Sequence, residues 1–315
     1  MRIFFATDIH GSEKCFLKFL NAAAFYGAQV LILGGDITGK AMVPIVKERN
    51  GSYRTVIHGR EILASTEAER EDLEKHIRFA GSYPFLTTPG ELDELRNDGE
   101  RLRRIFAQLI AESILRWIDI AESRLRSAGT HCFIQPGNDD EMAVGDLLGQ
   151  SDVVINPEGR VIELPGGYQL VSTGYANQTP WDCPRDMPEE DLQIRIAAIL
   201  SQLGSAEGTI FNFHCPPYNT NIDEAPRLDA DLRPLLGPGG QPRMAPVGST
   251  SVRKAIEERQ PLLGLHGHIH ESRGGVRLGR TICINPGSRY SEGILQGVIV
   301  DLQGNRVRNY QLTAG

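Results

Sequence analysis

Five short apolar runs constrain the fold of this chain more than any other feature, because each of them stops at a residue that can bind a metal ion. The runs are RIFFATDIH, VLILGGD, HCFIQPGND, TIFNFH and PLLGLHGHIH. Their length and apolar content are typical of buried strands, and helical patterns such as SEKCFLKFLNAAAFYG lie between them. This alternation predicts an α/β fold. Since ligands bind at the carboxyl ends of strands in open α/β sheets, we expect these polar residues to meet in one crevice.

The polar residues form two closely spaced pairs and three single positions. Asp8 and His10 end the first run and His268 and His270 end the last, and residues two apart in an extended backbone project to one side. The single positions are Asp36, Asn138 and His214. Mixed oxygen and nitrogen donors suit manganese, iron or zinc better than calcium or magnesium, and seven ligands exceed the four of a closed zinc site. The set therefore predicts two ions that share a bridging carboxylate.

The stretch GGDITGKA, residues 34–41, also fits most of a phosphate-binding P-loop. It fails at Ala41, where a Ser or Thr hydroxyl would reach the magnesium ion. It fails again downstream, because a P-loop opens a helix whereas the sequence after Ala41 alternates around an Asn50-Gly51 turn, which indicates a hairpin. We therefore interpret Asp36, at the end of a buried strand, as the functional group of this stretch.

About a hundred residues separate Asp36 from Asn138, although a crossover between parallel strands needs only a dozen or more. We therefore predict one domain over residues 1–315 with an insertion at 41–129. The insertion is expected to contain the hairpin, a helix that begins at Thr66, and the long amphipathic stretch GELDELRNDGERLRRIFAQLIAESILRWIDIAESRLRSAG. A long connection usually has a task, so we expect it to cover the site or to form a homo-oligomer contact.

The charge and cysteine content exclude several classes of protein. With 33 basic and 40 acidic side chains the net charge is −7, so no overall positive field attracts nucleic acid. The five cysteines are widely spaced and form no CxxC pair, which argues against a disulfide framework or a zinc ribbon and favours the reducing cytoplasm. The apolar run at the N-terminus is too short for a signal peptide, and no stretch approaches a membrane span.

Taken together, the motifs resemble the calcineurin-like metallophosphoesterase superfamily, in the branch of predicted bacterial and archaeal phosphoesterases related to cyclic-nucleotide phosphodiesterases. The family pattern D-x-H, G-D, G-N-H-[ED], a lone H and G-H-x-H appears in order, as Asp8-Ile9-His10, Gly35-Asp36, residues 137–140, His214 and residues 267–270. The resemblance implies a four-layer α/β/β/α sandwich with two divalent ions, manganese being favoured over iron, zinc, nickel or cobalt. It places Asp8, His10 and His270 on one ion, Asn138, His214 and His268 on the other, and Asp36 between them.

The resemblance also implies hydrolysis of a small phosphorylated or nucleotide-like substrate by a metal-bridging hydroxide, with Asp36, Asn138 and Asp139 as catalytic residues. Asp139 departs from the family motif, which has a histidine there that helps to bind phosphate and to protonate the leaving oxygen. An ionised carboxylate repels a phosphate dianion, so we expect phosphodiesters to be favoured over monoesters. His58 and His266 could replace the missing histidine, but a surface position and a buried structural position, respectively, are the simpler interpretations.

Four further residues are candidate substrate contacts. They are Asp140 in the third motif and three residues of a predicted loop, Tyr175, Asn177 and Trp181. Ordinary packing of that loop is the alternative. Two other functions stay open, a metal-dependent nuclease of similar fold and a non-catalytic metal-binding scaffold. A nuclease would need a groove with concentrated Lys and Arg, and the sequence does not indicate one. A scaffold would be expected to have lost some of the seven metal-binding residues, all of which are present.

Overall fold

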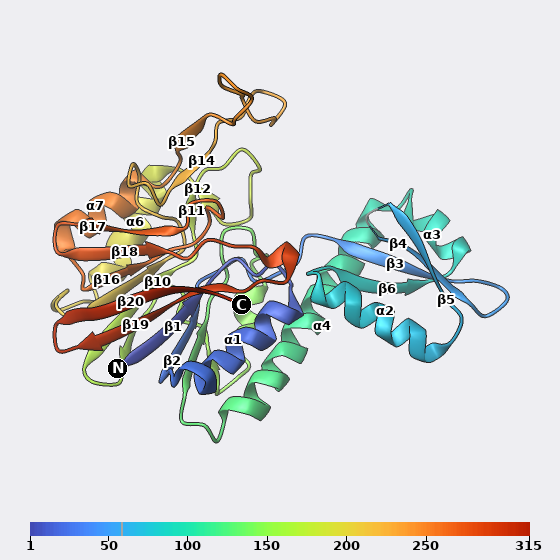
Figure 1. The fold of residues 1–315 in the computed structure, drawn as a ribbon, viewed down its shortest axis with the longest axis horizontal. Helices are drawn as coiled ribbons and strands as arrows, with labels where there is room; N and C mark the ends of the chain where they lie inside the picture. Colours follow the sequence, from blue (N-terminus) through green and yellow to red (C-terminus); the bar gives the residue numbers. More distant parts are fainter. Residues whose placement is uncertain (58) are drawn as a thin grey trace.

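Two six-stranded mixed sheets form the body of the chain in the computed structural model, which describes residues 1–57 and 59–315 (Figure 1). The first sheet has the order β20-β19-β1-β2-β7-β8. Its parallel strands are β1 (Arg2–Ala6), β2 (Val30–Leu33), β7 (His131–Ile134) and β8 (Val154–Ile155), and its antiparallel edge is β19 (Gln296–Gln303) and β20 (Arg306–Ala314). The apolar runs at residues 2–6, 30–33 and 131–134 are therefore neighbouring parallel strands, as the α/β pattern predicts.

The second sheet has the order β17-β18-β16-β13-β10-β9. Its parallel strands are β10 (Tyr168–Thr173), β13 (Thr209–Phe213), β16 (Leu263–Leu265) and β18 (Thr281–Asn285), with β9 (Val161–Leu164) and β17 (Gly274–Leu278) antiparallel at the edges. Thus the last two ligand-bearing runs, β13 and β16, are also adjacent parallel strands. Antiparallel hairpins join β9 to β10 and β17 to β18 in this sheet, and β19 to β20 in the first.

The two sheets pack face to face, and helices cover their outer faces. One buried cluster joins the sheets, with Phe5 and Ile32 from the first and Leu170 and Leu265 from the second. A second cluster packs α1 (Glu13–Tyr26), α4 (Gly99–Leu125) and α5 (Val144–Leu148) on the first sheet. A third packs α6 (Glu189–Leu200) and α7 (Thr250–Arg259) on the second. The prediction of an α/β fold is confirmed, with mixed rather than purely parallel sheets.

Residues 42–95 form a lobe beside the body, on the right of Figure 1. Its sheet has the order β5-β4-β3-β6 and its helices are α2 and α3. The bounds are β3 (Met42–Lys47), β4 (Tyr53–Ile57), β5 (Arg60–Ala64), α2 (Glu67–Phe79), β6 (Tyr83–Thr87) and α3 (Pro89–Leu95). The chain returns to the body through α4, where Trp117 stacks on Phe16 of α1 with ring centroids 4.3 Å apart.

The local signals in this segment are confirmed with one difference. The hairpin turns at Asn50-Gly51, and the Thr66 side chain accepts a hydrogen bond from the Glu69 backbone N–H to cap α2. The amphipathic stretch, however, is divided into α3 and α4 rather than continuous. The reason is local, because the Asp98 side chain accepts a hydrogen bond from the Arg101 backbone N–H and so begins a new helix.

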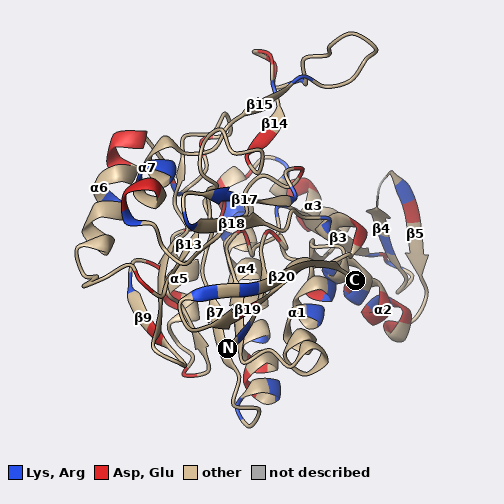
Figure 2. Cartoon of the chain, turned by 60° about the vertical axis from the view of Figure 1, so that its left-hand side comes forward, with Lys and Arg blue, Asp and Glu red and all other residues tan. Residues whose placement is uncertain are grey.

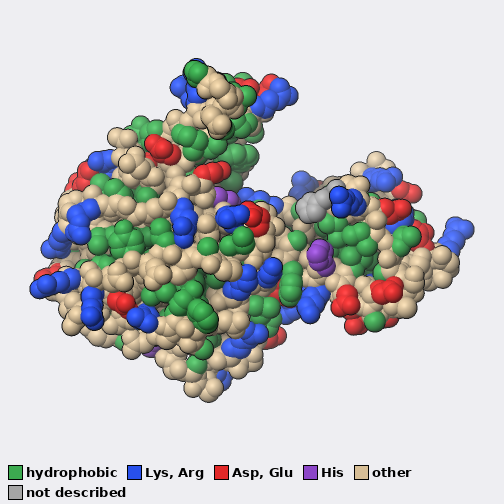
Figure 3. Space-filling model, viewed as in Figure 1, with side chains coloured by type: hydrophobic (Ala, Val, Ile, Leu, Met, Phe, Trp, Pro, Cys, Tyr) green, Lys and Arg blue, Asp and Glu red, His purple; other side chains and the backbone are tan. Residues whose placement is uncertain are grey.

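Two short strands form an arm that projects from the body at the top of Figure 1. They are β14 (Glu224–Pro226) and β15 (Met244–Pro246). The helices α2, α6 and α7 each carry charged residues of both signs (Figure 2). The space-filling view shows a hollow between the arm and the lobe (Figure 3). Within the described residues, no helix combines the length and the apolar content that a membrane crossing requires.

Three glycines make a close junction where the lobe leaves the body. A Cβ added to Gly39 would lie 2.2 Å from the Gly81 carbonyl oxygen, and one added to Gly11 would lie 2.7 Å from the Gly39 Cα. The Gly81 backbone in turn approaches His10, since its own added Cβ would lie 2.5 Å from the His10 carbonyl oxygen. The loop after β2 is therefore held between the loop after β1 and the turn before β6.

We expect Gly39→Ala to lower the free energy of unfolding by about 2 kcal/mol, because the added methyl group would meet rigid backbone. Gly99→Ala is the matched control, since an added Cβ there has no atom within 4 Å and the position begins a helix. That control should be neutral or slightly stabilising. Urea unfolding of the two variants measures the difference, and equal midpoints would show that the junction is not close-packed.

Candidate metal centre

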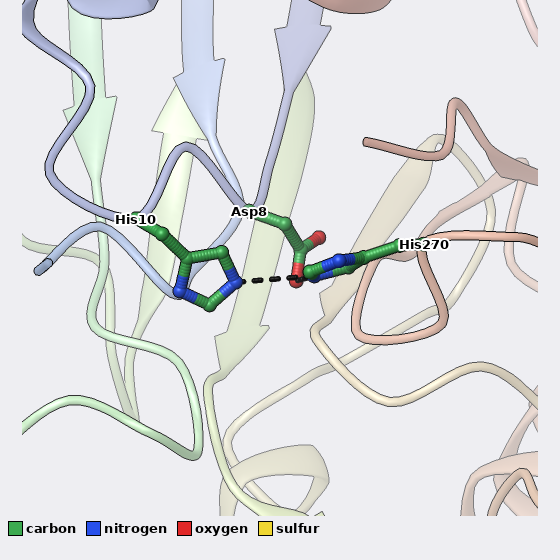
Figure 4. A group of neighbouring side chains, drawn as sticks. All are labelled: Asp8, His10 and His270. Atoms are coloured by element: carbon green, nitrogen blue, oxygen red, sulfur yellow. Dashed lines mark hydrogen bonds and ion pairs between the residues drawn. The ribbon is translucent and has the colours of Figure 1, made fainter. Parts of the chain in front are cut away.

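The carboxyl ends of β1, β2 and β7 in the first sheet meet those of β13 and β16 in the second. This arrangement groups the strand-end residues into sets whose potential ligand atoms lie within 4.8 Å of one another. In the part of the chain that the structure describes, the sets are Asp8, His10 and His270 (Figure 4); Asp36, His214 and His268; and His10, Asp36 and Asp139. The crevice that the sequence predicts is therefore present.

The closest distances show that both carboxylates face histidines from more than one strand. His10 Nε2 lies 3.1 Å from His270 Nε2, and His270 Nε2 lies 3.4 Å from Asp8 Oδ1. Asp36 Oδ1 lies 3.4 Å from His214 Nε2, while Asp36 Oδ2 lies 3.8 Å from His10 Nε2. One oxygen of Asp36 thus faces each of the first two sets, which is the geometry that a bridging carboxylate needs.

Asn138 joins the second set through its side-chain oxygen. Its Oδ1 lies 2.9 Å from His268 Nδ1, and its Nδ2 donates a hydrogen bond to Asp186 Oδ1 at 2.8 Å. The other oxygen of Asp186 accepts hydrogen bonds from the Thr179 and Cys183 backbone N–H groups at 3.0 and 3.1 Å. Asp186, at the start of the short strand β12 (Asp186–Met187), therefore orients the amide, and nothing in its sequence spacing indicates this role.

The backbone after the strands is not extended, and our reason for grouping the two sequence pairs was wrong. Asp8 and His10 have φ angles of 53° and 39°, and His268 has a φ angle of 67°. These values lie in the left-handed region, which non-glycine residues rarely occupy. Each side chain points into the centre because the chain turns sharply at the strand end. Such strain is found most often at functional sites, and Asp36 shares it with a φ angle of 50°.

The protonation states suit metal binding. Burial alone would raise the pKa of Asp8, but the charge of His214 and the contact with His270 outweigh it and lower that pKa to about 2. The pKa of Asp36 also lies well below its usual range, because the effect of His214 outweighs that of burial. Burial lowers the pKa of His10 to about 3. Ionised carboxylates and a neutral imidazole are the forms that coordinate metal ions.

The pKa of His214 indicates that the buried carboxylates of Asp8 and Asp36 need a positive charge beside them. Burial would lower its pKa, but Asp36 and Asp8 outweigh burial and raise it to about 9, so the ring is held as a cation between them. A buried pair of carboxylates needs a positive partner, and a divalent ion would supply that charge without the proton. His214 Nε2 and His10 Nδ1 are also buried without a hydrogen-bond partner among the described residues. The residues present therefore fit divalent cations.

Asp140 has a different place from the one we expected. It is fully buried, and its carboxylate accepts hydrogen bonds from the backbone N–H groups of Ile37, Thr38 and Gly137 at 3.0, 2.8 and 2.7 Å. The Thr38 hydroxyl donates a fourth at 2.5 Å. These donors leave the carboxylate no room for a substrate. We therefore correct the expectation that Asp140 contacts substrate: it holds the Asp36 loop against the Asn138 loop.

Asp139 lies on the open side of the centre, where Lys40 pairs with it. Lys40 Nζ is 2.5 Å from Asp139 Oδ2, and the two side chains are 54% and 24% exposed. Burial and the charge of Asp36 raise the pKa of Asp139, and Lys40 acts in the opposite direction. Sequence reasoning considered Lys40 only as part of a P-loop and missed this contact.

Of the two histidines that we considered as replacements for the missing one, only His266 lies within the described residues. His266 is fully buried, and its Nδ1 lies 2.8 Å from the Phe213 carbonyl oxygen, which supports the structural interpretation. His58 lies outside the described residues.

Of the three loop residues proposed as substrate contacts, two contact other protein groups and the third is exposed. Tyr175 packs against the guanidinium groups of Arg195 and Arg185, at 3.7 and 5.4 Å from its ring centroid. Asn177 donates a hydrogen bond to the Val247 carbonyl oxygen at 3.2 Å. Trp181 is 63% exposed. Their contact with substrate stays a prediction.

Comparisons with known proteins show the family of the chain and solved structures of similar fold. A sequence model of the family described as "Calcineurin-like phosphoesterase" matches residues 1–272. The chain is 32% identical over 153 residues to Uncharacterized protein MJ1162 of Methanocaldococcus jannaschii, a match that covers 48% of this chain and only 61% of that relative. Among solved structures, the fold is similar to that of TT1561 of Thermus thermophilus, with 16% identity, a TM-score of 0.54, and coverage of 100% of this chain and 97% of that one. A looser overlap, with a TM-score of 0.34 and 10% identity over the full length of both chains, is found with a novel archaeal phosphodiesterase.

Proposed function

Because the chain belongs to the calcineurin-like phosphoesterase family, we propose that it hydrolyses a small phosphoester with the help of two divalent metal ions. The observation that carries this proposal is the convergence of buried Asp and His residues from both sheets at one set of strand ends. The strained backbone that directs these side chains to a common space also supports a functional site there.

In this proposal each ion has its own ligand set, and Asp36 serves both. The first set is Asp8, His10 and His270, and the second is Asn138, His214 and His268. The mixture of imidazole nitrogen and carboxylate or amide oxygen suits manganese, iron or zinc. We take manganese, which the family resemblance implies, as our first assignment, with iron, zinc, nickel or cobalt as the alternatives. Such ions, when bound, act as Lewis acids toward a phosphoryl oxygen and lower the pKa of a coordinated water.

The chain's own groups orient these ligands. The Thr7 hydroxyl donates to Asp8 Oδ2 at 2.7 Å, and the His268 backbone N–H donates to the same oxygen at 3.0 Å. The Asp139 backbone N–H donates to Asp36 Oδ1 at 3.1 Å. Both carboxylates are therefore held before any ion or substrate arrives. His270, 31% exposed, and Asp139 mark the side on which a substrate can enter.

We propose that the enzyme prefers phosphodiesters to monoesters. Because Lys40 pairs with Asp139, this preference is smaller than it would be if the Asp139 charge had no partner. The Asp139 carboxylate is less exposed than the Lys40 ammonium, so solvent screens its charge less. Its repulsion of a phosphoryl dianion is therefore only partly offset by Lys40. This balance favours diesters, which carry a single negative charge. Among them, the family resemblance points to small nucleotide-like diesters, including cyclic nucleotides.

The same proposal treats residues 1–315 as one domain, a four-layer α/β/β/α sandwich with an insertion at 41–129, that acts in the cytoplasm. The packing of helices on the outer faces of two stacked sheets supports the layering. All five cysteines are free, which supports a reducing compartment. The exposed Val56 and Leu63 of the lobe offer a homo-oligomer contact, and light scattering, which measures molar mass in solution, tests it.

Metal content and hydrolysis test the proposal together. Protein saturated with Mn²⁺ should retain about two ions per chain and should hydrolyse bis-p-nitrophenyl phosphate or a cyclic nucleotide. A chelator should abolish this activity, and added Mn²⁺ should restore it. One ion or fewer per saturated chain would contradict the binuclear site. Cleavage of single-stranded DNA in preference to all small esters would instead favour the nuclease alternative.

A further inference from the structure

The loop that carries Lys40 is fixed relative to the metal centre. The Gly39 backbone N–H donates to the Tyr83 hydroxyl at 2.7 Å, and the Thr38 backbone N–H donates to Asp140. The close backbone contacts among Gly11, Gly39 and Gly81 hold the same loop from the other side. Lys40 therefore starts from a rigid position four residues after Asp36, although its side chain is half-exposed.

The Lys40 ammonium lies at the open rim of the centre. Its partner is Asp139 Oδ2, and that same oxygen lies 3.9 Å from His10 Nδ1. Tyr290, half-buried, lies against His10 with ring centroids 4.7 Å apart and the ring planes tilted by 50°, and it forms another part of the rim. The Asp139 carboxylate thus lies between the Lys40 ammonium and the candidate metal ligand His10. This is the side of the centre on which Asp139 and His270 are partly exposed.

We propose that Lys40 is a substrate-binding residue whose ammonium group contacts the non-bridging oxygens of the substrate's phosphoryl group, and that Asp139 holds it over the metal centre. This inference rests on the proposed function and adds a residue that contributes to the selectivity between phosphomonoesters and phosphodiesters. Lysine binds phosphate as a compact point charge, and its flexible stem allows the ammonium to move from the carboxylate to a nearby anion. Lys40 therefore favours the more highly charged phosphoryl group, whereas Asp139 opposes it.

Lys40 could act in two ways: it could bind the phosphoryl group directly, or it could only neutralise the charge of Asp139. If Lys40 touches the phosphoryl group, it still matters when Asp139 carries no charge. If it only neutralises Asp139, its effect disappears with that charge. The comparison therefore uses four proteins: native, Lys40→Met, Asp139→Asn, and the double variant. Lys254→Met, an exposed lysine of α7, is the matched control.

Two measurements are made on each Mn²⁺-loaded protein. Calorimetry gives the dissociation constant of inorganic phosphate, and kinetics gives kcat/KM for p-nitrophenyl phosphate and bis-p-nitrophenyl phosphate, which share a leaving group. Removing Lys40 should weaken phosphate binding about tenfold in the Asp139→Asn background, a discounted value because solvent screens a half-exposed charge. The loss should be larger in the native background, where Asp139 would also be left without its partner. The monoester-to-diester ratio of kcat/KM should fall by a similar factor. Metal content should not change, and Lys40→Arg, which keeps the charge, should stay close to native.

An unchanged phosphate affinity when Lys40 is removed from the Asp139→Asn protein would overturn the proposal, because Lys40 would then act only on Asp139. Equal losses for the monoester and the diester would also overturn it. Failure of the proposed hydrolysis is a separate result. If loaded native protein cleaves neither ester, the enzymatic function is wrong, while the phosphate titration still decides whether Lys40 binds the anion.

Discussion

Asp36→Asn is expected to lower kcat/KM for the preferred phosphoester by about a thousandfold and to reduce the metal content below two ions per chain. The two oxygens of Asp36 face different ligand sets, at 3.4 Å from His214 Nε2 and 3.8 Å from His10 Nε2. An amide at this position is neutral and turns a donor toward one of the sets. Removing one partner from a buried charge pair costs about 3–5 kcal/mol, and each 1.4 kcal/mol in the transition state is about a tenfold change in rate.

Asn177→Ala is the comparison for this variant, because Asn177 comes from the candidate substrate loop and its amide contacts Val247 rather than the strand-end ligands. At most it orients a substrate, so its loss should be about tenfold or less. Mass spectrometry of the native protein gives the ion count, and steady-state kinetics gives the rate. If Asp36→Asn keeps two ions and loses no more activity than Asn177→Ala, Asp36 does not bridge the centre.

Asp140→Asn is expected to have the largest effect on stability, a loss of about 3 kcal/mol in the free energy of unfolding. The Asp140 carboxylate accepts four hydrogen bonds from Ile37, Thr38 and Gly137, and an asparagine would point an NH₂ group at some of these donors. Hydrogen bonds to a buried charged group contribute about 1.5–3 kcal/mol each to stability. A buried N–H group left without an acceptor destabilises the protein further, because it has also lost its hydrogen bonds to water. Because these bonds join the Asp36 and Asn138 loops, metal affinity should fall as well.

Urea unfolding in the presence of a chelator isolates the effect of Asp140→Asn on the protein from its effect on metal binding. Asp146→Asn, an exposed acidic residue on α5, is the matched control and should change stability by less than about 0.5 kcal/mol. A loss no larger than that of the control would show that the buried carboxylate does not hold the two loops together.

Most of the metal centre follows from the sequence because its signal is local. An apolar run that ends at Asp, Asn or His predicts both a buried strand and a polar residue at its carboxyl end. In sheets with parallel central strands those ends lie at one edge, so the predicted crevice did not depend on the details of any loop. The same local character explains why the Asn50-Gly51 hairpin and the Thr66 helix cap were predicted correctly.

The features that sequence reasoning missed depend on contacts between distant segments. Lys40 meets Asp139, Asp186 orients the Asn138 amide, and Asp140 accepts donors from the Asp36 loop. No spacing rule relates these pairs, because folding rather than chain distance brings them together.

What the sequence by itself determined is therefore the class of fold and the identity of the strand-end residues, since hydrophobic periodicity and chain order are sufficient for both. Only the tertiary structure decided how those residues are used. It turned the backbone at Asp8, His10 and His268 into the left-handed region, so the side chains converge by a sharp turn rather than along an extended strand. It also placed the Lys40 cation against the Asp139 carboxylate, because the loops after β2 and β7 lie side by side at the edge of one sheet. The charge that a substrate meets is set by that contact, and two residues so far apart in the chain can offset one another only after the sheet has formed.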